Sequence, residues 1–263
     1  MVSKIESVQN EKIKSAVKLA LSSKERAAQG LFFLEGLRLC GDVLNSPLSI
    51  DTLFYTAQCL EKHGEIIRAL SSAAENVYEI SPAVSKKLTQ TQTPQGVFCI
   101  VHETLLVSAD ELRSDGQYIA LENIQDPANL GAIIRTAESL GVKGAILCGC
   151  CDVCNPKALR ASMGSLLRLP LYQCDDLPQT LQRCSMHGMR VFATTPDESA
   201  KKITDCDMSG GVILVIGNEG NGVTAQTMAV CERITIPMLG RAESLNASMA
   251  AAIVMWEMMK QHS

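Results

Sequence analysis

The clearest pattern along the chain is a helical stripe in residues 129–140. Apolar side chains recur there at steps of three and four residues, namely Leu130, Ile133, Ile134, Ala137 and Leu140. Such spacing predicts an amphipathic helix that packs one face on a core. Asp126 before Pro127 is a favourable helix start, and Gly141 is a favourable stop.

Two polar residues, Asn129 and Arg135, lie off this stripe. The helix follows a predicted strand, 118–122, so Asn129 falls in the first helical turn. In open α/β sheets ligands bind at that junction, at the carboxyl ends of the strands. We therefore expect both side chains to face a ligand, and a solvated Asn and Arg are the alternative that this one helix leaves open.

Strand-like and helix-like segments alternate along the whole chain. The first part reads as a small α/β unit, with strands "GLFFLEG", "IDTLFY", "NVYEI" and "GVFCIVH" between helical segments. The polar stretch 103–117 reads as a linker. A second unit follows, with strands "YIALEN", "GAILCG", "LRLPLY", "RVFATT", "GVILVIG" and "RITIP". We predict domains at 1–102 and 118–263, the second an α/β domain with a parallel sheet.

Composition narrows the class of protein. No apolar run is long enough to span a membrane, and the first residues have no secretory pattern. Because disulfides are typical of secreted proteins, we expect the eleven cysteines to be reduced thiols. We expect a cytoplasmic protein. The net charge is −4, but residues 1–40 hold seven Lys or Arg and four Glu. This basic end permits a phosphate-binding face, with Lys24 and Arg26 as candidates, although a solvated helix would look the same.

A glycine-rich stretch, "VILVIGNEGNGV" at 212–223, runs on from a buried strand. Gly217, Gly220 and Gly222 give the order G-x-x-G-x-G, which is not the G-x-G-x-x-G of dinucleotide-binding folds. It also lacks the Gly-Lys-Ser/Thr of a P-loop. The pattern predicts a tight turn that lets the backbone approach a ligand, with Glu219 in its middle.

The cysteine cluster "CGCCDVC" (Cys148, Cys150, Cys151, Cys154) looks like a metal knuckle. It has no second ligand pair at zinc-finger spacing and no His nearby, so we expect small buried residues and no metal. The four His of the chain lie in no catalytic pattern.

The stretch 234–260, "ITIPMLGRAESLNASMAAAIVMWEMMK", is the most informative one. A strand, a polar loop and a small-residue helix are predicted, with Ser244 as the helix cap. Ser244 and Asn246 in the helix mouth also offer hydrogen-bonding groups to a bound ligand.

Three stretches, "NIQDPANLGAIIRTAESLG", "VIGNEGNGV" and "IPMLGRAESLNASMAAAI", resemble in order and spacing the motifs of the SpoU (TrmH-like) branch of the SPOUT RNA methyltransferases. The likeness covers roughly the last 145 residues. The segment "FFLEGLRLC" is similar to the L30e-like RNA-binding domain that precedes the catalytic domain in this family.

The resemblance implies an RNA ribose 2′-O-methyltransferase that uses S-adenosyl-L-methionine, acts as a homodimer and has a trefoil-knotted parallel α/β domain. Its implied substrate is 23S rRNA or tRNA, with no membrane or DNA partner. The implied catalytic residues are Asn129, Arg135, Glu219, Ser244 and Asn246. The implied cofactor-binding residues are Thr194, Gly217, Ile236 and Leu245.

Three alternatives differ in class. A SPOUT-fold RNA-binding protein without activity would have lost pocket polar groups, and this chain keeps all five. A base methyltransferase is disfavoured by the SpoU-type motifs. An NAD-dependent oxidoreductase would need the glycine order that is absent.

Overall fold

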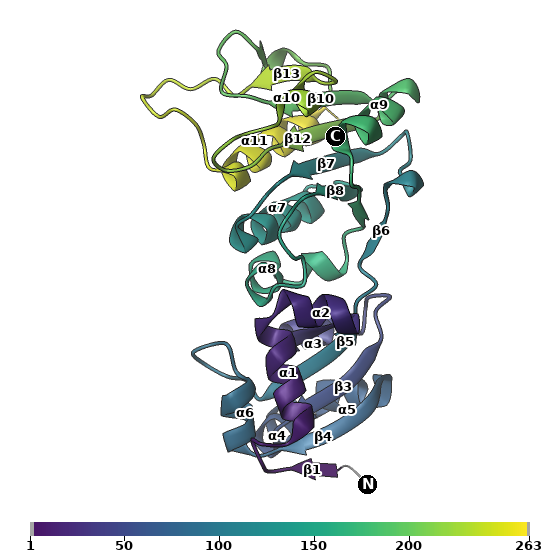
Figure 1. Cartoon of the computed structure of the whole chain (residues 1–263), viewed down its shortest axis with the longest axis vertical. Coiled ribbons are helices and arrows are strands. Elements are labelled where there is room, and N and C mark those ends of the chain that lie inside the picture. Colours follow the sequence, from purple (N-terminus) through teal and green to yellow (C-terminus); the bar gives the residue numbers. More distant parts are fainter. Residues whose placement is uncertain (1–2, 262–263) are drawn as a thin grey trace. The chain divides into compact units, whose positions relative to one another are not determined.

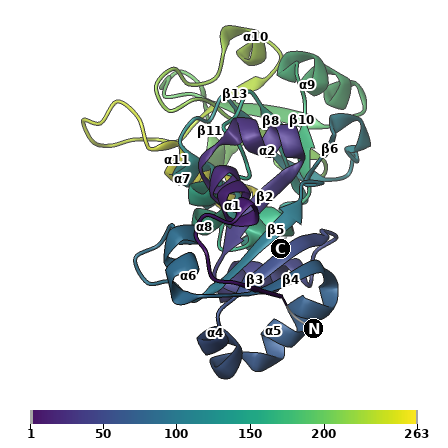
Figure 2. The same cartoon turned by 60° about the horizontal axis from the view of Figure 1, so that its bottom comes forward.

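Two α/β units make up the chain in the computed structural model, which describes residues 3–261 (Figures 1 and 2). The first unit comprises the residues up to Leu105 and the segment Cys154–Leu167, and the second comprises Leu106–Val153 and the residues from Arg168 onward. The segment Cys154–Leu167 thus groups with the first unit, although it lies inside the predicted second domain. Residues 106–117, predicted as linker, give the second unit a strand and a short helix.

The first unit is a mixed sheet with helices on both faces. Its strands, in the order β1-β4-β3-β5-β2, are β1 (Ser3–Ile5), β2 (Leu31–Glu35), β3 (Ile50–Tyr55), β4 (Ala74–Ile80) and β5 (Val97–His102). Its helices are α1 (Glu11–Leu21), α2 (Ser23–Gln29), α3 (Leu37–Val43), α4 (Ala57–Lys62), α5 (Gly64–Ala73), α6 (Pro82–Leu88), α8 (Pro156–Ser162) and the 3₁₀ helix η2 (Ser165–Leu167). β5 runs antiparallel to both β2 and β3, and α1 and α6 pack on one common core.

The second unit is built on an eight-stranded sheet in which every pairing is parallel. Its strands are β6 (Leu106–Ser108), β7 (Gln117–Glu122), β8 (Gly144–Cys148), β9 (Leu171–Gln173), β10 (Arg190–Thr194), β11 (Lys201–Lys202), β12 (Val212–Ile216) and β13 (Glu232–Thr235). They lie in the order β11-β13-β10-β12-β7-β8-β9-β6, so all their carboxyl ends meet at one edge. The predicted parallel α/β class is confirmed.

Helices cover both faces of this sheet. They are α7 (Pro127–Ser139), α9 (Leu177–Met186), α10 (Ala225–Met228) and α11 (Ala247–Lys260), with the 3₁₀ helices η1 (Ala109–Glu111) and η3 (Ile203–Asp205). α7 and α11 pack against each other, and α9 packs on the core of the opposite face (Figure 1).

The α7 prediction is confirmed in detail. Asp126 caps the helix by accepting from the N–H of Ala128, and Gly141 takes a left-handed φ of +76° just beyond the helix end. Four residues of the apolar stripe, Leu130, Ile133, Ile134 and Ala137, are buried, and Leu140, just beyond the helix, is half-buried. Asn129 is half-buried and Arg135 is exposed.

Four strands differ from those predicted from the sequence. The strand predicted for "LRLPLY" begins only at Leu171, because η2 and Pro170 occupy its first part and Pro170 has no N–H to donate to a ladder. The edge strands β1, β6 and β11 were not predicted, since they span only three, three and two residues.

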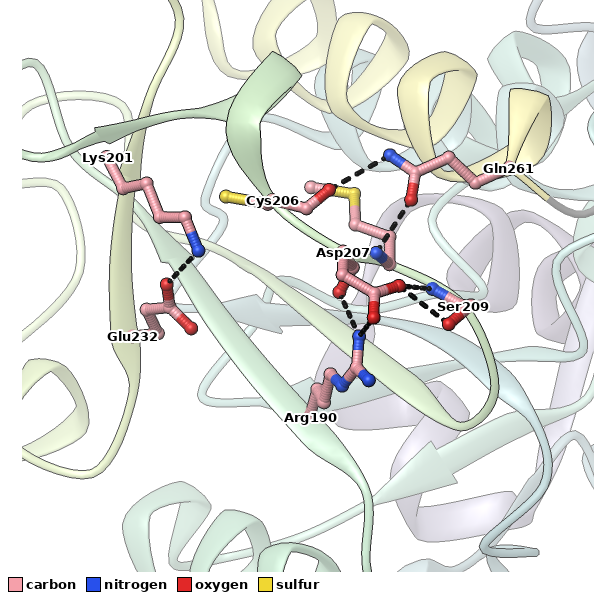
Figure 3. A network of polar contacts seen from close by, with 8 residues as sticks. Arg190, Lys201, Cys206, Asp207, Ser209, Glu232 and Gln261 are labelled. Carbon is pink, nitrogen blue, oxygen red and sulfur yellow. Dashed lines mark hydrogen bonds and ion pairs between the residues drawn. The ribbon is translucent and has the colours of Figure 1, made fainter.

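The far end of α11 is fastened to the segment before β12. Gln261 donates through Nε2 to the Cys206 carbonyl at 3.1 Å and accepts through Oε1 from the N–H of Met208 at 2.8 Å. Figure 3 shows the same segment held from the other side, where Arg190 pairs with Asp207 at 2.5 Å. These contacts fix α11, whose other end borders the site described next.

Candidate functional site

A pocket of about 330 Å³ opens at the carboxyl edge of the eight-stranded sheet. Its walls come from the ends of β10, β12 and β13 and from the start of α11, which are distant in sequence. The pocket includes all four residues that the family resemblance assigned to cofactor binding, namely Thr194, Gly217, Ile236 and Leu245. It also includes Glu219 and Ser244.

The glycine-rich turn after β12 forms one wall of this pocket. Asn218 accepts through Oδ1 from the N–H groups of Gly220 and Asn221, at 2.9 and 3.0 Å, which closes the turn. Gly217 lies so close to the returning backbone that a Cβ there would be 2.1 Å from the carbonyl carbon of Gly222. The turn therefore requires a glycine at this position, as the sequence suggested.

Glu219 is held as a carboxylate by several donors. It accepts from Asn129 Nδ2 at 3.0 Å and from the N–H groups of Asp126 and Gln125 at 3.2 and 3.3 Å. Partial desolvation acts to raise the pKa of the Glu219 carboxyl, but the hydrogen bonds from Asn129 and the backbone outweigh it and leave the pKa below its ordinary value. Glu219 is thus an ionised anchor at neutral pH.

Asn246 joins the same hydrogen-bonded chain. Its Nδ2 donates to Asn129 Oδ1 at 3.1 Å, and its Oδ1 accepts from the N–H of Ser248 at 2.9 Å. Asn246 is therefore the cap of α11. The prediction that Ser244 caps the helix is wrong, because the helix begins three residues later and the better-placed Asn fills that position.

Ser244 and Arg135 occupy different surroundings. Ser244 is exposed in the loop between β13 and α11, on the wall of the pocket. Arg135 lies six residues beyond Asn129 on α7 and is not among the residues that line the pocket of its own chain. Within residues 3–261, no hydrogen bond or ion pair to the Arg135 guanidinium is found.

Glu122 is a site-supporting residue that the sequence reading missed. It is buried at the end of β7 and accepts from the N–H and the hydroxyl of Thr224 at 2.7 and 2.8 Å, and from the hydroxyl of Thr227 at 2.5 Å. These bonds fix the segment that follows the glycine-rich turn. A carboxylate directly after the apolar run "YIAL" was the available signal.

The four cysteines of the cluster (Cys148, Cys150, Cys151 and Cys154) do not share one set of contacts. The Cys150 thiol donates to the Leu121 carbonyl at 3.2 Å, and Cys154 groups with the first unit. Within residues 3–261, ligand atoms close enough to share a metal ion are found at Asp51, Glu75 and His102 and not among these thiols.

The two residues predicted to contact phosphate, Lys24 and Arg26, have different surroundings in the structure. Lys24 is exposed on α2, whereas Arg26 is buried, and its guanidinium donates to the Leu19 carbonyl at 2.5 Å. The assignment of Arg26 to RNA binding therefore does not fit the structure, because its charge is committed to closing α1 onto α2.

The sequence matches the profile of a known family. The sequence profile of the SpoU rRNA Methylase family matches residues 116–256, more than half of the chain. The chain belongs to the SpoU rRNA methylase family. A second profile, the MRM3-like substrate binding domain, matches residues 10–99. The family inferred from the three sequence motifs is thereby confirmed.

Relatives of this SpoU chain match along nearly its whole length. The 23S rRNA (guanosine(2553)-2′-O)-methyltransferase RlmP of Bacillus subtilis is 30% identical, over 97% of this chain and 98% of RlmP. The AdoMet-bound rRNA methyltransferase from Sinorhizobium meliloti has a TM-score of 0.88 at 28% identity and 98% coverage of both chains. The AviRb methyltransferase from Streptomyces viridochromogenes, solved with AdoMet, has a TM-score of 0.84 at 25% identity, over 97% of this chain and 98% of AviRb.

None of the helices in the described part of the chain is both long and apolar enough to cross a bilayer.

Proposed function

We propose that this SpoU protein transfers the methyl group of S-adenosyl-L-methionine to a ribose 2′-hydroxyl of RNA, with 23S rRNA as the first substrate to test and tRNA as the second. The observation that carries the proposal is the pocket at the sheet edge, which is lined by residues of the second and third family motifs. Asn129 of the first motif joins them through its hydrogen bonds to Glu219 and Asn246. The 2′-O-methyltransferase activity named for RlmP supports the choice of a ribose oxygen.

The pocket fits the cofactor by size and lining. Its volume of about 330 Å³ lies within the usual range of small-molecule sites. Ile236 and Leu245 give apolar contact for an adenine ring, and the turn at Gly217 leaves backbone groups open to polar atoms. The Thr194 hydroxyl donates to the Val215 carbonyl at 3.1 Å, so Thr194 contributes mainly shape.

S-adenosyl-L-methionine would supply an electrophilic methyl group. The chain would hold the ribose oxygen in line with that methyl group and exclude water that competes for it. Ser244 brings an exposed hydroxyl to the pocket wall, and we assign it to orienting the ribose.

Neither charged candidate is suited to remove the ribose proton. Glu219 has a lowered pKa and its oxygens already accept several hydrogen bonds, and a guanidinium does not deprotonate in proteins. We assign Glu219, Asn129 and Asn246 to positioning the pocket walls. Arg135 is assigned to gripping RNA phosphate and favouring negative charge on the reacting oxygen.

The first unit supplies the RNA-binding surface in this proposal. A groove of about 920 Å³ there is lined by three lysines, Lys4, Lys62 and Lys86, by two glutamates, Glu6 and Glu79, and by polar side chains. Lys4 already pairs with Glu79 at 2.9 Å, which leaves Lys62 and Lys86 as the better phosphate contacts. We propose this groove, with Lys24, as the RNA-binding face in place of Arg26.

The protein is also proposed to act as a cytoplasmic homodimer. α11 exposes Met249, Ile253 and Trp256, which recur at steps of four and three residues and are 57%, 39% and 54% exposed. An apolar helical stripe of this kind is typical of an interface. The trefoil knot stays a prediction from the family resemblance.

Methyl transfer from radiolabelled S-adenosyl-L-methionine to transcripts of 23S rRNA and tRNA tests the proposed function. The product nucleosides should carry the label on the ribose. Label on a base would show the base-methyltransferase alternative, and RNA binding without transfer would show the non-catalytic one. Calorimetry before and after a chelator should give the same cofactor affinity, because no step in the proposal uses a metal.

A further inference from the structure

Two cysteines occupy neighbouring positions at the carboxyl edge of the eight-stranded sheet. β8 and β9 are parallel and pair Ala145 with Leu171 and Leu147 with Gln173, so the next pair in this register is Cys148 and Cys174. The N–H of Cys174 donates to the Leu147 carbonyl at 3.1 Å, which continues the ladder to that point.

The geometry of this pair suits a disulfide. Residues at the same register on neighbouring strands face the same side of a sheet, and neighbouring strands lie roughly 4.8 Å apart. Disulfides join Cα atoms that are about 4.4–6.8 Å apart. Both side chains pack at the margin of one apolar cluster and remain partly exposed, so a small oxidant can reach them.

The two thiols already interact with each other. A hydrogen bond from Cys174 is the main cause that lowers the pKa of Cys148 to about 7, against the opposing effect of burial. The same hydrogen bond, with burial, raises the pKa of Cys174. Cys148 is thus the more readily ionised of the two thiols, and the thiolate is the nucleophilic form of cysteine.

The neighbouring cysteines Cys150 and Cys151 differ from Cys148 in their pKa values. Burial is the main cause that raises the pKa of Cys150 to about 12 and that of Cys151 to about 11. The Cys150 thiol donates to the Leu121 carbonyl at 3.2 Å, whereas the Cys148 thiol makes a longer contact of 3.8 Å to the Asp175 carbonyl. Reactivity is therefore expected at Cys148 and not at the rest of the cluster.

We propose that Cys148 and Cys174 are a site of reversible oxidation, at which a small-molecule disulfide such as oxidised glutathione converts the two thiols into one intramolecular disulfide. The Cys148 thiolate attacks one sulfur of oxidised glutathione, the glutathione S–S bond breaks, and one glutathione leaves. Cys174 then gives up its proton and attacks the Cys148 sulfur, and the second glutathione leaves. Two electrons pass to oxidised glutathione, which becomes two reduced glutathione molecules.

The pair is close to the hydrogen bonds that hold Glu219. The Cys148 carbonyl accepts from the N–H of Asn123 at 2.8 Å, and the next carbonyl, that of Gly149, accepts from Gln125 Nε2 at 2.8 Å. The N–H of Gln125 in turn donates to Glu219 at 3.3 Å. Closing the disulfide would lock both side chains into one fixed geometry and so strain this loop, which should weaken cofactor binding; this coupling rests on the proposed function.

The test treats the reduced full-length protein with oxidised glutathione, blocks the remaining thiols by alkylation and maps the peptides by mass spectrometry. The expected product is a peptide pair joined through Cys148 and Cys174, reversed by dithiothreitol. Cys174→Ser should stop at a mixed disulfide between Cys148 and glutathione, and Cys148→Ser should form neither product. Cys151→Ser should behave as the unchanged protein does.

A second measurement does not depend on the variants. In the unchanged protein at pH 7, iodoacetamide should alkylate Cys148 about tenfold or more faster than Cys151, because a lower pKa gives the larger thiolate fraction. Equal rates, or a disulfide that uses Cys150 or Cys151, would overturn the proposal. Complete oxidation with unchanged S-adenosyl-L-methionine affinity would overturn the coupling to the pocket, whereas a reduced protein that binds no cofactor would count against the proposed function.

Discussion

The side-chain amide of Asn246 donates to Oδ1 of Asn129 at 3.1 Å, although the two residues are 117 positions apart in the chain. The side-chain amide of Asn129 in turn donates to the Glu219 carboxylate at 3.0 Å. One residue from each of the three family motifs is thus linked in a single hydrogen-bonded chain. The helix start of α7, the glycine-rich turn and the helix start of α11 are held together by it, and this sets the shape of the pocket.

A double-mutant cycle should measure this link. Asn129→Ala and Asn246→Ala are each expected to destabilise the fold, and the double variant should lose less than the sum of the two, with a coupling of about 1 kcal/mol for a hydrogen bond between them. Denaturant unfolding gives the three free energies. As a control, Asn129→Ala combined with Ser139→Ala, whose hydroxyl donates to the Arg135 carbonyl, should be additive. Additivity in the first pair as well would argue against the link.

Gly217→Ala should collapse the pocket wall, because the new Cβ would meet the backbone of Gly222 and no flexible side chain could give way. We expect a lower melting temperature and at least a tenfold loss of S-adenosyl-L-methionine affinity by calorimetry. Gly220→Ala is the matched control, since its Cβ would be 3.6 Å from Asn218 Oδ1, an ordinary contact. Equal affinity in the two variants would show that the turn is not the constraint.

The lowered pKa of Glu219 predicts a pH dependence of stability. A carboxyl whose folded pKa lies below its ordinary value of 4.5 stabilises the fold above that value, and the contribution is lost as the pH falls through the folded pKa. The advantage of the unchanged protein over Glu219→Gln should therefore be constant from about pH 8 to pH 5 and shrink below about pH 4.5. Thermal melts across this range measure it, with Glu243→Gln in the exposed loop as the comparison. An advantage that grows in acid would contradict the assignment.

Arg135→Ala should separate catalysis from folding. The side chain is exposed, so the loss of stability should stay within about half a kcal/mol. Single-turnover methylation should nevertheless fall about a hundredfold or more, because a charge near the reacting oxygen acts mainly in the transition state. Arg135→Lys should recover only part of it, since an ammonium lacks the planar fork that grips two oxygens.

The control for this variant is Arg113→Ala, which removes an arginine that pairs with Asp115 on the surface of the same unit. It should leave both turnover and cofactor affinity unchanged. Normal turnover in a folded Arg135→Ala protein would return Arg135 to the role of a solvated surface residue.

The sequence predicted the second unit well where a single physical rule dominated. The α7 stripe and its Asp126 cap follow from local periodicity and from the capping preference of one residue. Position 217 requires glycine because the backbone of Gly222 leaves no room for a Cβ. Other features depend on three-dimensional context. Ser244 and Asn246 are both good caps in sequence, and only packing selects Asn246. Arg26 lies in a basic run that looks solvated, yet the fold turns its guanidinium inward to the Leu19 carbonyl.

The hydrogen bonds that link Asn129, Glu219 and Asn246 could not be predicted from the sequence pattern either. Periodicity assigned each residue to its own helix or turn, but contact between them requires the strand order, which places β12 beside β7. The same holds for Glu122, whose partners Thr224 and Thr227 lie on the far side of a long sequence gap. The segment Cys154–Leu167 likewise joins the first unit through tertiary contacts that no local pattern encodes.

The most direct test of the account is nucleoside analysis of RNA after single-turnover reaction with S-adenosyl-L-methionine, for the unchanged protein and for Ser244→Ala in parallel. The account predicts one 2′-O-methylated nucleotide per substrate molecule from the unchanged protein, and a large loss of that product from Ser244→Ala with cofactor affinity retained within a few-fold. Methylation on a base, or equal ribose methylation by both proteins, would contradict it.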